Sequence, residues 1–302
     1  MYPNQLAYHG NHRHPHIPLR SSPMYRIVAS DMDETFLNYD AAIPEANLEA
    51  VHKMRQLGVH FVIATGRPYF SIIKDLKALG LAGNPDEFAI TINGALVKAC
   101  DGTVVASHPL DPSIVGRLID FAVDRDLCLH LYGPEATYVW NMNPGEWDFL
   151  NGRMEVVELT LDQIRALDCP IYKVLVENED TQALHDIRDQ AFAQMPDLAS
   201  KVETVFSSDR YVEFNTAGVS KGAGLKDVAD RLGVPMQDTI AVGDAVNDLA
   251  MLQAAGAGCV VANASGLLRP LLPQDTYYLH SNCAEGCMPE VLNDLIIPSM
   301  DK

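Results

Sequence analysis

The sequence has little positive charge and no long apolar run. Its 302 residues include 22 Lys and Arg against 40 Asp and Glu, which gives a formal net charge of −18. Such a charge repels nucleic acids and anionic membrane surfaces, so neither is expected as a partner. No stretch reaches the ~20 apolar residues that a membrane-spanning helix needs, and the first residues lack the apolar core of a secretion signal. These absences predict a cytoplasmic protein.

Paired cysteines and several common motifs are missing as well. The six cysteines are scattered through apolar stretches, so we expect reduced and mostly buried thiols. Cys283 and Cys287 have no second pair nearby, and zinc is not expected. The chain has no Gly-x-x-x-x-Gly-Lys-Ser/Thr loop, no complete dinucleotide fingerprint and no Gly-x-Ser-x-Gly elbow. The sequence therefore does not indicate ATP, NAD or a serine nucleophile.

The feature that is present is a repeated alternation of short β-branched runs and helical stretches, which is typical of βαβ units. This rhythm is interrupted in the middle of the chain and returns near Ser220. We therefore predict an α/β fold with a doubly wound, Rossmann-like parallel-sheet core in two segments, residues 24–109 and 208–302. An α+β cap domain is expected to be inserted at residues 110–207. The His-, Asn- and Pro-rich residues 1–23 are expected to form a flexible tail.

Acidic residues follow two of the predicted core strands. Asp31 and Asp33 stand at the end of the first apolar run, and Asp244 and Asp248 follow another run far downstream. Because strand side chains alternate between faces, Asp31 and Asp33 share one pocket only while the strand persists or where it opens into a loop. Ligands of open parallel sheets bind beyond the carboxyl ends of the strands, where the two acidic pairs can converge. Carboxylate oxygens suit a hard cation, and Mg²⁺ is the predicted occupant.

Other residues at strand-to-helix junctions can hold a phosphate. Thr65 supplies a hydroxyl donor, and Gly66 leaves the next backbone N–H accessible. Lys221 opens a predicted helix, where its ammonium and the helix N-terminus can both meet phosphoryl oxygens. Asn247 adds an amide donor. Each such residue alone is most often a turn former, a cap or a solvated charge, but their occurrence at successive junctions favours a function.

Together these motifs resemble those of the haloacid dehalogenase-like hydrolases, specifically the Cof-type sugar-phosphatase branch. The motifs are Asp31-Met32-Asp33-Glu34-Thr35, Thr65-Gly66-Arg67, Ser220-Lys221-Gly222, and Gly243-Asp244 with Asn247-Asp248. The resemblance implies that Asp31 is a nucleophile and that Asp33 is a general acid and base. It also implies that Asp31, the backbone carbonyl of Asp33 and Asp244 hold Mg²⁺, with Asp248 touching the ion or its water shell.

The resulting prediction is a magnesium-dependent phosphatase that hydrolyses small phosphomonoesters, such as sugar phosphates, through an aspartyl-phosphate. Two alternatives stay open: a mutase-like phosphoryl transferase on the same fold, and a non-catalytic protein that binds phosphorylated metabolites. The cap is expected to close over the substrate. Tyr132, Trp140 and Trp147 are candidates for substrate contacts, although aromatic residues of such a domain are more often core.

Several residues have two open interpretations. Asn93 either contacts the substrate or forms a plain Asn-Gly turn, and Arg67 either reaches a substrate anion or braces its loop. Glu213 and Asn263 are expected near the site by analogy, with a structural role favoured for each. Glu34 stands where the resembled family usually has glycine, which adds a side chain and a negative charge beside the entry to the pocket.

Overall fold

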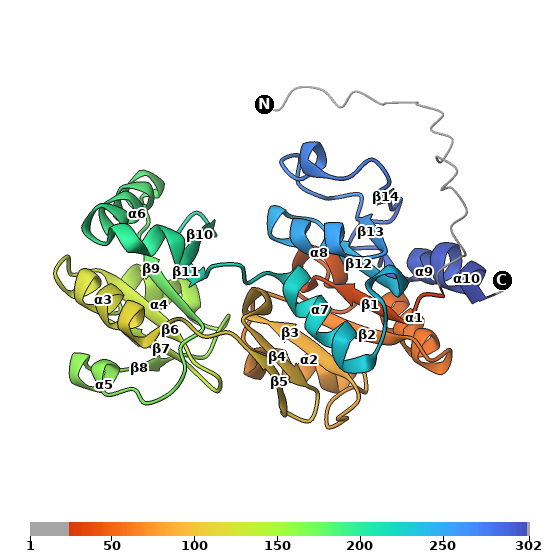
Figure 1. The fold of residues 1–302 in the computed structure, drawn as a ribbon, viewed down its shortest axis with the longest axis horizontal. Coiled ribbons are helices and arrows are strands. Elements are labelled where there is room, and N and C mark those ends of the chain that lie inside the picture. The colour runs from red at the N-terminus through yellow and green to blue at the C-terminus, as the bar shows by residue number, and fades with distance from the viewer. Residues whose placement is uncertain (1–23, 301–302) are drawn as a thin grey trace.

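The computed structural model describes residues 24–300, and the core of the molecule is one sheet of eight strands (Figure 1). The predicted tail at residues 1–23 lies outside the described residues. The strand order is β14 (Tyr277–Tyr278), β13 (Ala257–Val260), β12 (Thr239–Gly243), β1 (Ile27–Ser30), β2 (His60–Ala64), β3 (Phe88–Thr91), β4 (Leu96–Ala99) and β5 (Val104–Ser107). Neighbours from β14 to β3 pair in parallel, whereas β4 and β5 form an antiparallel extension at one edge.

Helices cover both faces of this sheet, which confirms the doubly wound prediction. One face is covered by α1 (Glu45–Gln56), α2 (Ile73–Ala78) and α9 (Met288–Val291), and the other by α7 (Lys221–Leu232) and α8 (Leu249–Ala254). The described chain ends with α10 (Ile297–Met300). Because side chains alternate along a strand, Val28 and Ile27 of β1 belong to two separate apolar clusters, one under each helical layer. Burial on both faces explains the continuous apolar runs in the sequence.

The residues between β5 and α7 form a second, six-stranded sheet. Its order is β10 (Val202–Ser207), β11 (Tyr211–Thr216), β9 (Lys173–Glu177), β6 (Cys128–Tyr132), β7 (Thr137–Trp140) and β8 (Val157–Glu158). Helices α3 (Pro112–Val123), α5 (Leu161–Arg165) and α6 (Thr181–Gln194) cover one face, and α4 (Pro144–Leu150) lies over the other. Most pairs are antiparallel, so the inserted domain has the predicted α+β character.

One boundary of the cap differs from the prediction. Strand β11 pairs with β9 and β10 up to Thr216, so residues 208–216 belong to the cap sheet and not to the core. The chain returns to the core only at α7. The alternating pattern of a strand shows which side chains share a face, but it does not show which sheet accepts the strand, and this is why the sequence boundary at residue 207 falls too early.

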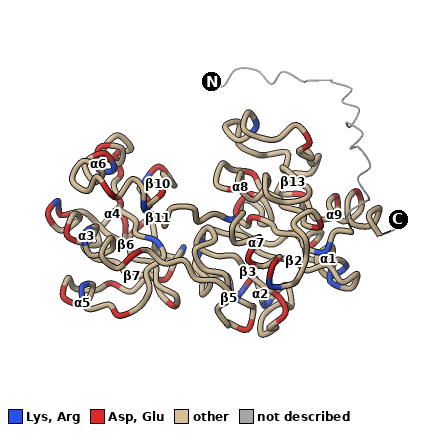
Figure 2. The backbone as a smooth tube through the Cα atoms, in the orientation of Figure 1, with Lys and Arg blue, Asp and Glu red and all other residues tan. Residues whose placement is uncertain are grey.

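Cap and core touch through a small set of contacts. Ile92 and Leu96 of the core pack in one apolar cluster with Tyr132 and Leu175 of the cap. The ammonium of Lys98 on β4 also donates to a carboxylate oxygen of Glu135 in the cap at 2.7 Å. Acidic positions are spread over both domains, as Figure 2 shows. No helix among residues 24–300 is both long enough and apolar enough to span a bilayer.

Candidate active site

Asp31 occupies the first position after β1, in the middle of the core sheet. Its backbone N–H donates to the carbonyl oxygen of Val242 on β12 at 2.9 Å, so the end of β1 stays attached to its neighbour. The chain then leaves the strand through a tight turn at Met32–Phe36, in which Glu34 has a φ of 56°. As a result Asp31 is buried at 7% exposure, while the side chain of Asp33 is 53% exposed.

Three carboxylates and one ammonium meet at this point. Three carboxylate oxygens, one each from Asp31, Asp244 and Asp248, lie within 4.8 Å of one another. The ammonium of Lys221, fully buried, lies 2.5 Å from Asp31 Oδ1 and 2.6 Å from Asp248 Oδ1. The other oxygen of Asp248 accepts the backbone N–H groups of Asp244 and Ala245, each at 3.0 Å. The structure thus brings together four residues that the sequence predicts for one site.

The charges of this cluster favour a further cation. Burial raises the pKa of Asp31 well above its usual range, and this desolvation outweighs the lowering effect of Lys221. Burial likewise raises the pKa of Asp244 to about 6. Three carboxylates with one ammonium form an oxygen-rich, net negative set, and such a set fits Mg²⁺. Asp31, Asp244 and Asp248 would hold the ion.

Asp33, also predicted for this site, lies apart from the three carboxylates. Its side chain forms a bidentate ion pair with Arg67. Nε of Arg67 donates to Oδ2 of Asp33 at 2.9 Å, and Nη2 donates to Oδ1. A role for the backbone carbonyl of Asp33 in metal binding stays a prediction. Arg67 therefore has the bracing role that one of its two interpretations gave it, and its partner in that role is Asp33, a predicted acid and base.

The loop after β2 and the turn after β3 form the predicted phosphate corner. The hydroxyl of Thr65 accepts a hydrogen bond from the backbone N–H of Arg67 at 3.1 Å. The backbone carbonyl of Thr65 accepts one from the backbone N–H of Asn93 at 2.9 Å. The Oδ1 atom of Asn93 has no hydrogen-bond partner among the described residues. It lies 3.2 Å from where a Cβ on Gly66 would stand, so any side chain at position 66 would crowd this corner.

Asn247 is less clearly placed than the other predicted residues. It is exposed on the short turn between β12 and α8, and no hydrogen bond fixes its side chain within residues 24–300. Lys221 is better fixed, because Ser220 caps α7 by accepting the backbone N–H of Ala223 at 3.1 Å. This confirms the predicted start of the helix.

Other residues close to the carboxylates have structural contacts. The hydroxyl of Thr35 donates to Asp244 Oδ1 at 2.6 Å. Thr35 was part of a motif in the sequence, but its contact with a distant aspartate depends on the fold. Asn263 donates to the carbonyl of Glu34 at 2.7 Å and accepts the backbone N–H of Cys283 at 2.9 Å, so it braces the turn. Glu213, which was expected near the site by analogy, lies on β11 in the cap sheet.

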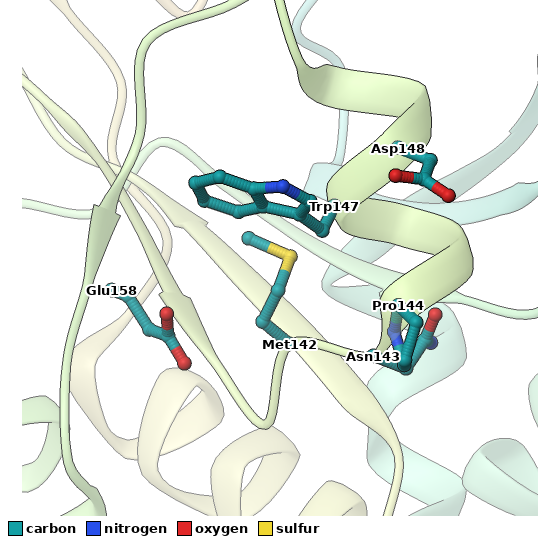
Figure 3. A pocket seen from close by; sticks show the side chains of 6 residues that line it. All are labelled: Met142, Asn143, Pro144, Trp147, Asp148 and Glu158. Atoms are coloured by element: carbon teal, nitrogen blue, oxygen red, sulfur yellow. The ribbon is translucent and has the colours of Figure 1, made fainter.

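The three aromatic candidates of the cap have different surroundings. Trp140 packs against the apolar cluster beneath α3 and α6, and Tyr132 lies in the cluster shared with the core. Trp147 is 53% exposed and lines an open surface hollow of about 360 Å³, where its indole lies beside Met142 and opposite Glu158 (Figure 3). Apart from Trp147, no residue predicted for the site lines this hollow. Only Tyr132 is therefore placed toward the core.

The fold and the site define an α/β enzyme whose site lies beyond the carboxyl ends of a parallel sheet. Residues 28–276 match the family model of the haloacid dehalogenase-like hydrolases, and the chain belongs to that family. The predictions of this family and of an enzyme are confirmed.

Individual relatives agree with this membership. A Streptococcus pyogenes protein named as a phosphatase is 31% identical over 251 residues, which are 79% of this chain and 87% of the relative. An HMP-PP phosphatase of Cronobacter sakazakii is 30% identical over 250 residues, 83% of this chain and 89% of the relative. A Plasmodium vivax HAD/Cof-like hydrolase has the same fold, with a TM-score of 0.78 at 19% identity over 92% of this chain and 98% of that one.

Proposed function

We propose that the protein is a magnesium-dependent phosphatase that hydrolyses small phosphomonoesters through an aspartyl-phosphate on Asp31. The observation that supports this most is the pairing of a buried carboxylate with an exposed one two residues later. Asp31 lies beside Lys221, Asp244 and Asp248, whereas Asp33 is solvent-accessible and held by Arg67. A nucleophile and a proton shuttle are needed together for ester hydrolysis but not for binding alone. The two relatives named as phosphatases support the same reaction class.

The first step transfers the phosphoryl group to the protein. A carboxylate oxygen of Asp31 forms a bond to phosphorus while the bond to the leaving oxygen breaks, and Asp33 gives a proton to that oxygen. Bound Mg²⁺ would neutralise negative charge on the carboxylates and the phosphoryl oxygens. Lys221 adds a fixed positive charge beside Asp31. The hydroxyl of Thr65 offers a donor to the phosphoryl oxygens, whereas the backbone N–H of Arg67 already donates to that hydroxyl.

The second step returns the enzyme to its starting state. Asp33, now deprotonated, takes a proton from a water molecule as that water attacks the phosphorus, and the Asp31–phosphorus bond breaks. The exposure of Asp33 allows water to reach it, and the ion pair with Arg67 keeps its carboxylate in a defined orientation. Hydrolysis in two steps replaces one difficult displacement on a dianion with two easier ones.

A mutase-like transferase and a non-catalytic binder remain the alternatives. Steady release of inorganic phosphate without an added acceptor distinguishes the phosphatase from both. The partner proposed is a small phosphorylated metabolite, without nucleic acid or membrane, because the overall charge of −18 disfavours both polyanions. A cytoplasmic location stays a prediction.

The test of the proposed reaction is the substitution Asp31→Asn, assayed for phosphate release with Mg²⁺ present. An amide cannot attack phosphorus, so we expect turnover to fall by ~10³-fold or more while the folded structure persists. Asp40→Asn, at an exposed position in the turn before α1, serves as the matched control and is expected to keep its activity. Undiminished turnover by the Asp31 variant, with a normal circular dichroism spectrum, would refute the assignment.

A further inference from the structure

A hollow of about 200 Å³ lies in the core domain, at the edge of the eight-stranded sheet beside β5. Phe88, the first residue of β3, and Ala99, the last residue of β4, line it and are paired across the two strands. Strand β3 ends at Thr91, beside the phosphate corner. The hollow therefore lies at the opposite end of this strand from the candidate active site.

Helix α7 extends from the candidate active site to this hollow. Lys221, the first residue of α7, lies beside Asp31, whereas Arg231, in the last turn of α7, lines the hollow. Ten residues of α-helix rise about 15 Å, so the two cationic positions are about 15 Å apart along the helix axis. No residue predicted for the site lines the hollow, and the two places are separate.

The walls of the hollow are mostly apolar, and an irregularity of the edge strand contributes to them. The register of β4 and β5 shifts between Val97 and Lys98, which leaves Val105 as the extra residue of a β-bulge. Bulges at sheet edges redirect side chains, and here Val104 and Val105 both line the hollow. Val104 is 50% exposed, so this apolar surface is in contact with water. A ligand with an apolar body would cover it.

Arg231 is the charged group of the hollow. Its guanidinium is exposed and forms no ion pair or hydrogen bond with residues 24–300. The neighbouring carboxylates of α7 have other partners, because Asp227 contacts His108 and Asp230 pairs with Lys226. None of the residues that line the hollow is acidic. The hollow therefore has one positive charge that this part of the chain leaves unpaired.

These features favour a small ligand with one negative charge. A guanidinium binds a carboxylate through two parallel hydrogen bonds, and Thr103 adds a hydroxyl to the lining. One cation balances one anionic charge, whereas the apolar walls disfavour a second charge that would lose its water. We propose that the hollow between Arg231 and the bulge of β5 binds a small apolar monocarboxylate.

The size of the hollow favours a free acid over a protein partner. Its volume of about 200 Å³ is below the ~300–1,000 Å³ of pockets for drug-sized ligands, which limits the ligand to one ring or a short branched chain. A specific protein interface buries about 1,200–2,000 Å² around an apolar centre. Between residues 85 and 110, Val104 is the only exposed large apolar side chain, so the surroundings of the hollow offer no such centre.

Isothermal titration calorimetry at fixed ionic strength tests this proposal, with phenylacetate as the probe. 2-Phenylethanol has a similar skeleton with a neutral head group, and acetate has the charge without the ring. We expect phenylacetate to bind one site with a dissociation constant of about 1 mM, at the low end of the binding energy reached per ligand atom. Both comparison compounds should bind at least about tenfold more weakly, because each lacks one of the two contacts.

Three variants locate the binding site. Arg231→Gln should weaken phenylacetate binding about tenfold and leave 2-phenylethanol unaffected, because only the acid uses the guanidinium. Val104→Asp adds a carboxylate at an exposed position and should abolish binding of the acid by repulsion. Lys77→Gln is the matched control, since it removes an exposed cation from the last turn of α2 on the other face of the sheet and should leave both affinities unchanged.

Three results would overturn the proposal: equal affinity for phenylacetate and 2-phenylethanol, full affinity of the Arg231 variant for phenylacetate, or no saturable binding of the acid. Tighter binding of a peptide that ends in a phenylalanine carboxylate would also contradict it, because the occupant would then be a protein terminus. These measurements need no phosphorylated substrate, so their failure leaves the proposed phosphatase function untouched.

Discussion

At the scale of single residues, Glu34 is the clearest departure from what the sequence motif leads one to expect. It occupies a left-handed backbone conformation, with a φ of 56°, at a position where the resemblance to the family led us to expect glycine. L-residues with a Cβ atom pay roughly 1–2 kcal/mol for this region. The carbonyl of Glu34 is nevertheless fixed by the Asn263 amide, so the turn that separates Asp31 from Asp33 persists despite the strain. Strain of this kind is characteristic of functional sites.

We predict that Glu34→Gly raises the free energy of unfolding by about 0.5–1 kcal/mol, because relief of the left-handed strain exceeds the entropic cost of glycine in the unfolded chain. Urea denaturation measures this change. Glu34→Ala is the matched control: it removes the same charge but keeps Cβ, and it should bring no comparable gain. A lower stability of the glycine variant would show that the Glu34 side chain contributes more than its backbone costs.

At the scale of elements, the turn between β3 and β4 contacts both the loop after β2 and the start of α7, and so helps to position the site. Ile92, Asn93 and Gly94 all have positive φ, at 50°, 54° and 97°. The backbone N–H groups of Ile92 and Asn93 donate to the carbonyls of Arg67 and Thr65, and these bonds tie the turn to the loop after β2. On its other side, Gly94 abuts the first turn of α7. This one turn therefore fixes the phosphate corner and the start of the helix that carries Lys221.

Gly94→Ala tests this arrangement at the level of packing. A Cβ at this position would lie 2.1 Å from the carbonyl oxygen of Ser220, a backbone atom that has little freedom to move. Gly102→Ala is a matched control, since Gly102 has a φ of 96° but nothing within 4 Å of its Cβ position. We expect the Gly102 variant to lose about 1 kcal/mol of unfolding free energy from the backbone alone and the Gly94 variant at least about 2 kcal/mol more. Equal losses in chemical denaturation would contradict the close contact.

At the scale of the whole molecule, the site depends on two chain segments that the cap separates in sequence. Asp31 lies at the end of β1, whereas Lys221, Asp244 and Asp248 come after the cap. Parallel pairing of β1 with β12 brings them together. The resulting cluster is acidic in a chain of net charge −18, whose acidic positions lie in both domains (Figure 2). A cation bound there relieves repulsion between segments on both sides of the insertion.

Mg²⁺ is therefore expected to stabilise the folded protein, independently of any assay of turnover. At a concentration about 100 times its dissociation constant, one ion adds about 2.7 kcal/mol to the free energy of unfolding, and the midpoint of thermal unfolding should rise accordingly. Asp244→Asn should weaken this response, because one of the three carboxylates is lost. Sodium chloride at matched ionic strength controls for screening. The same rise in the variant as in wild type would rule out binding at this cluster.

The local elements could be predicted from the sequence because their determinants are neighbours along the chain. Alternating apolar residues mark β6 and β7 at Cys128–Tyr132 and Thr137–Trp140. Ser220 indicates the start of α7, and Gly233, in the left-handed conformation, indicates its end. The order of the acidic motifs likewise indicated Asp31, Lys221, Asp244 and Asp248 as one site.

Tertiary structure alone decided which of these elements and side chains meet. The sequence does not show that β11 joins the cap sheet, that Arg67 pairs with Asp33, or that Asn215 is buried without a partner. Each of these depends on which residues, far apart in the sequence, reach the same strand edge, the same cation or the same space in the folded chain. Periodicity and capping act over a few residues, whereas such competition is resolved only when the whole chain packs.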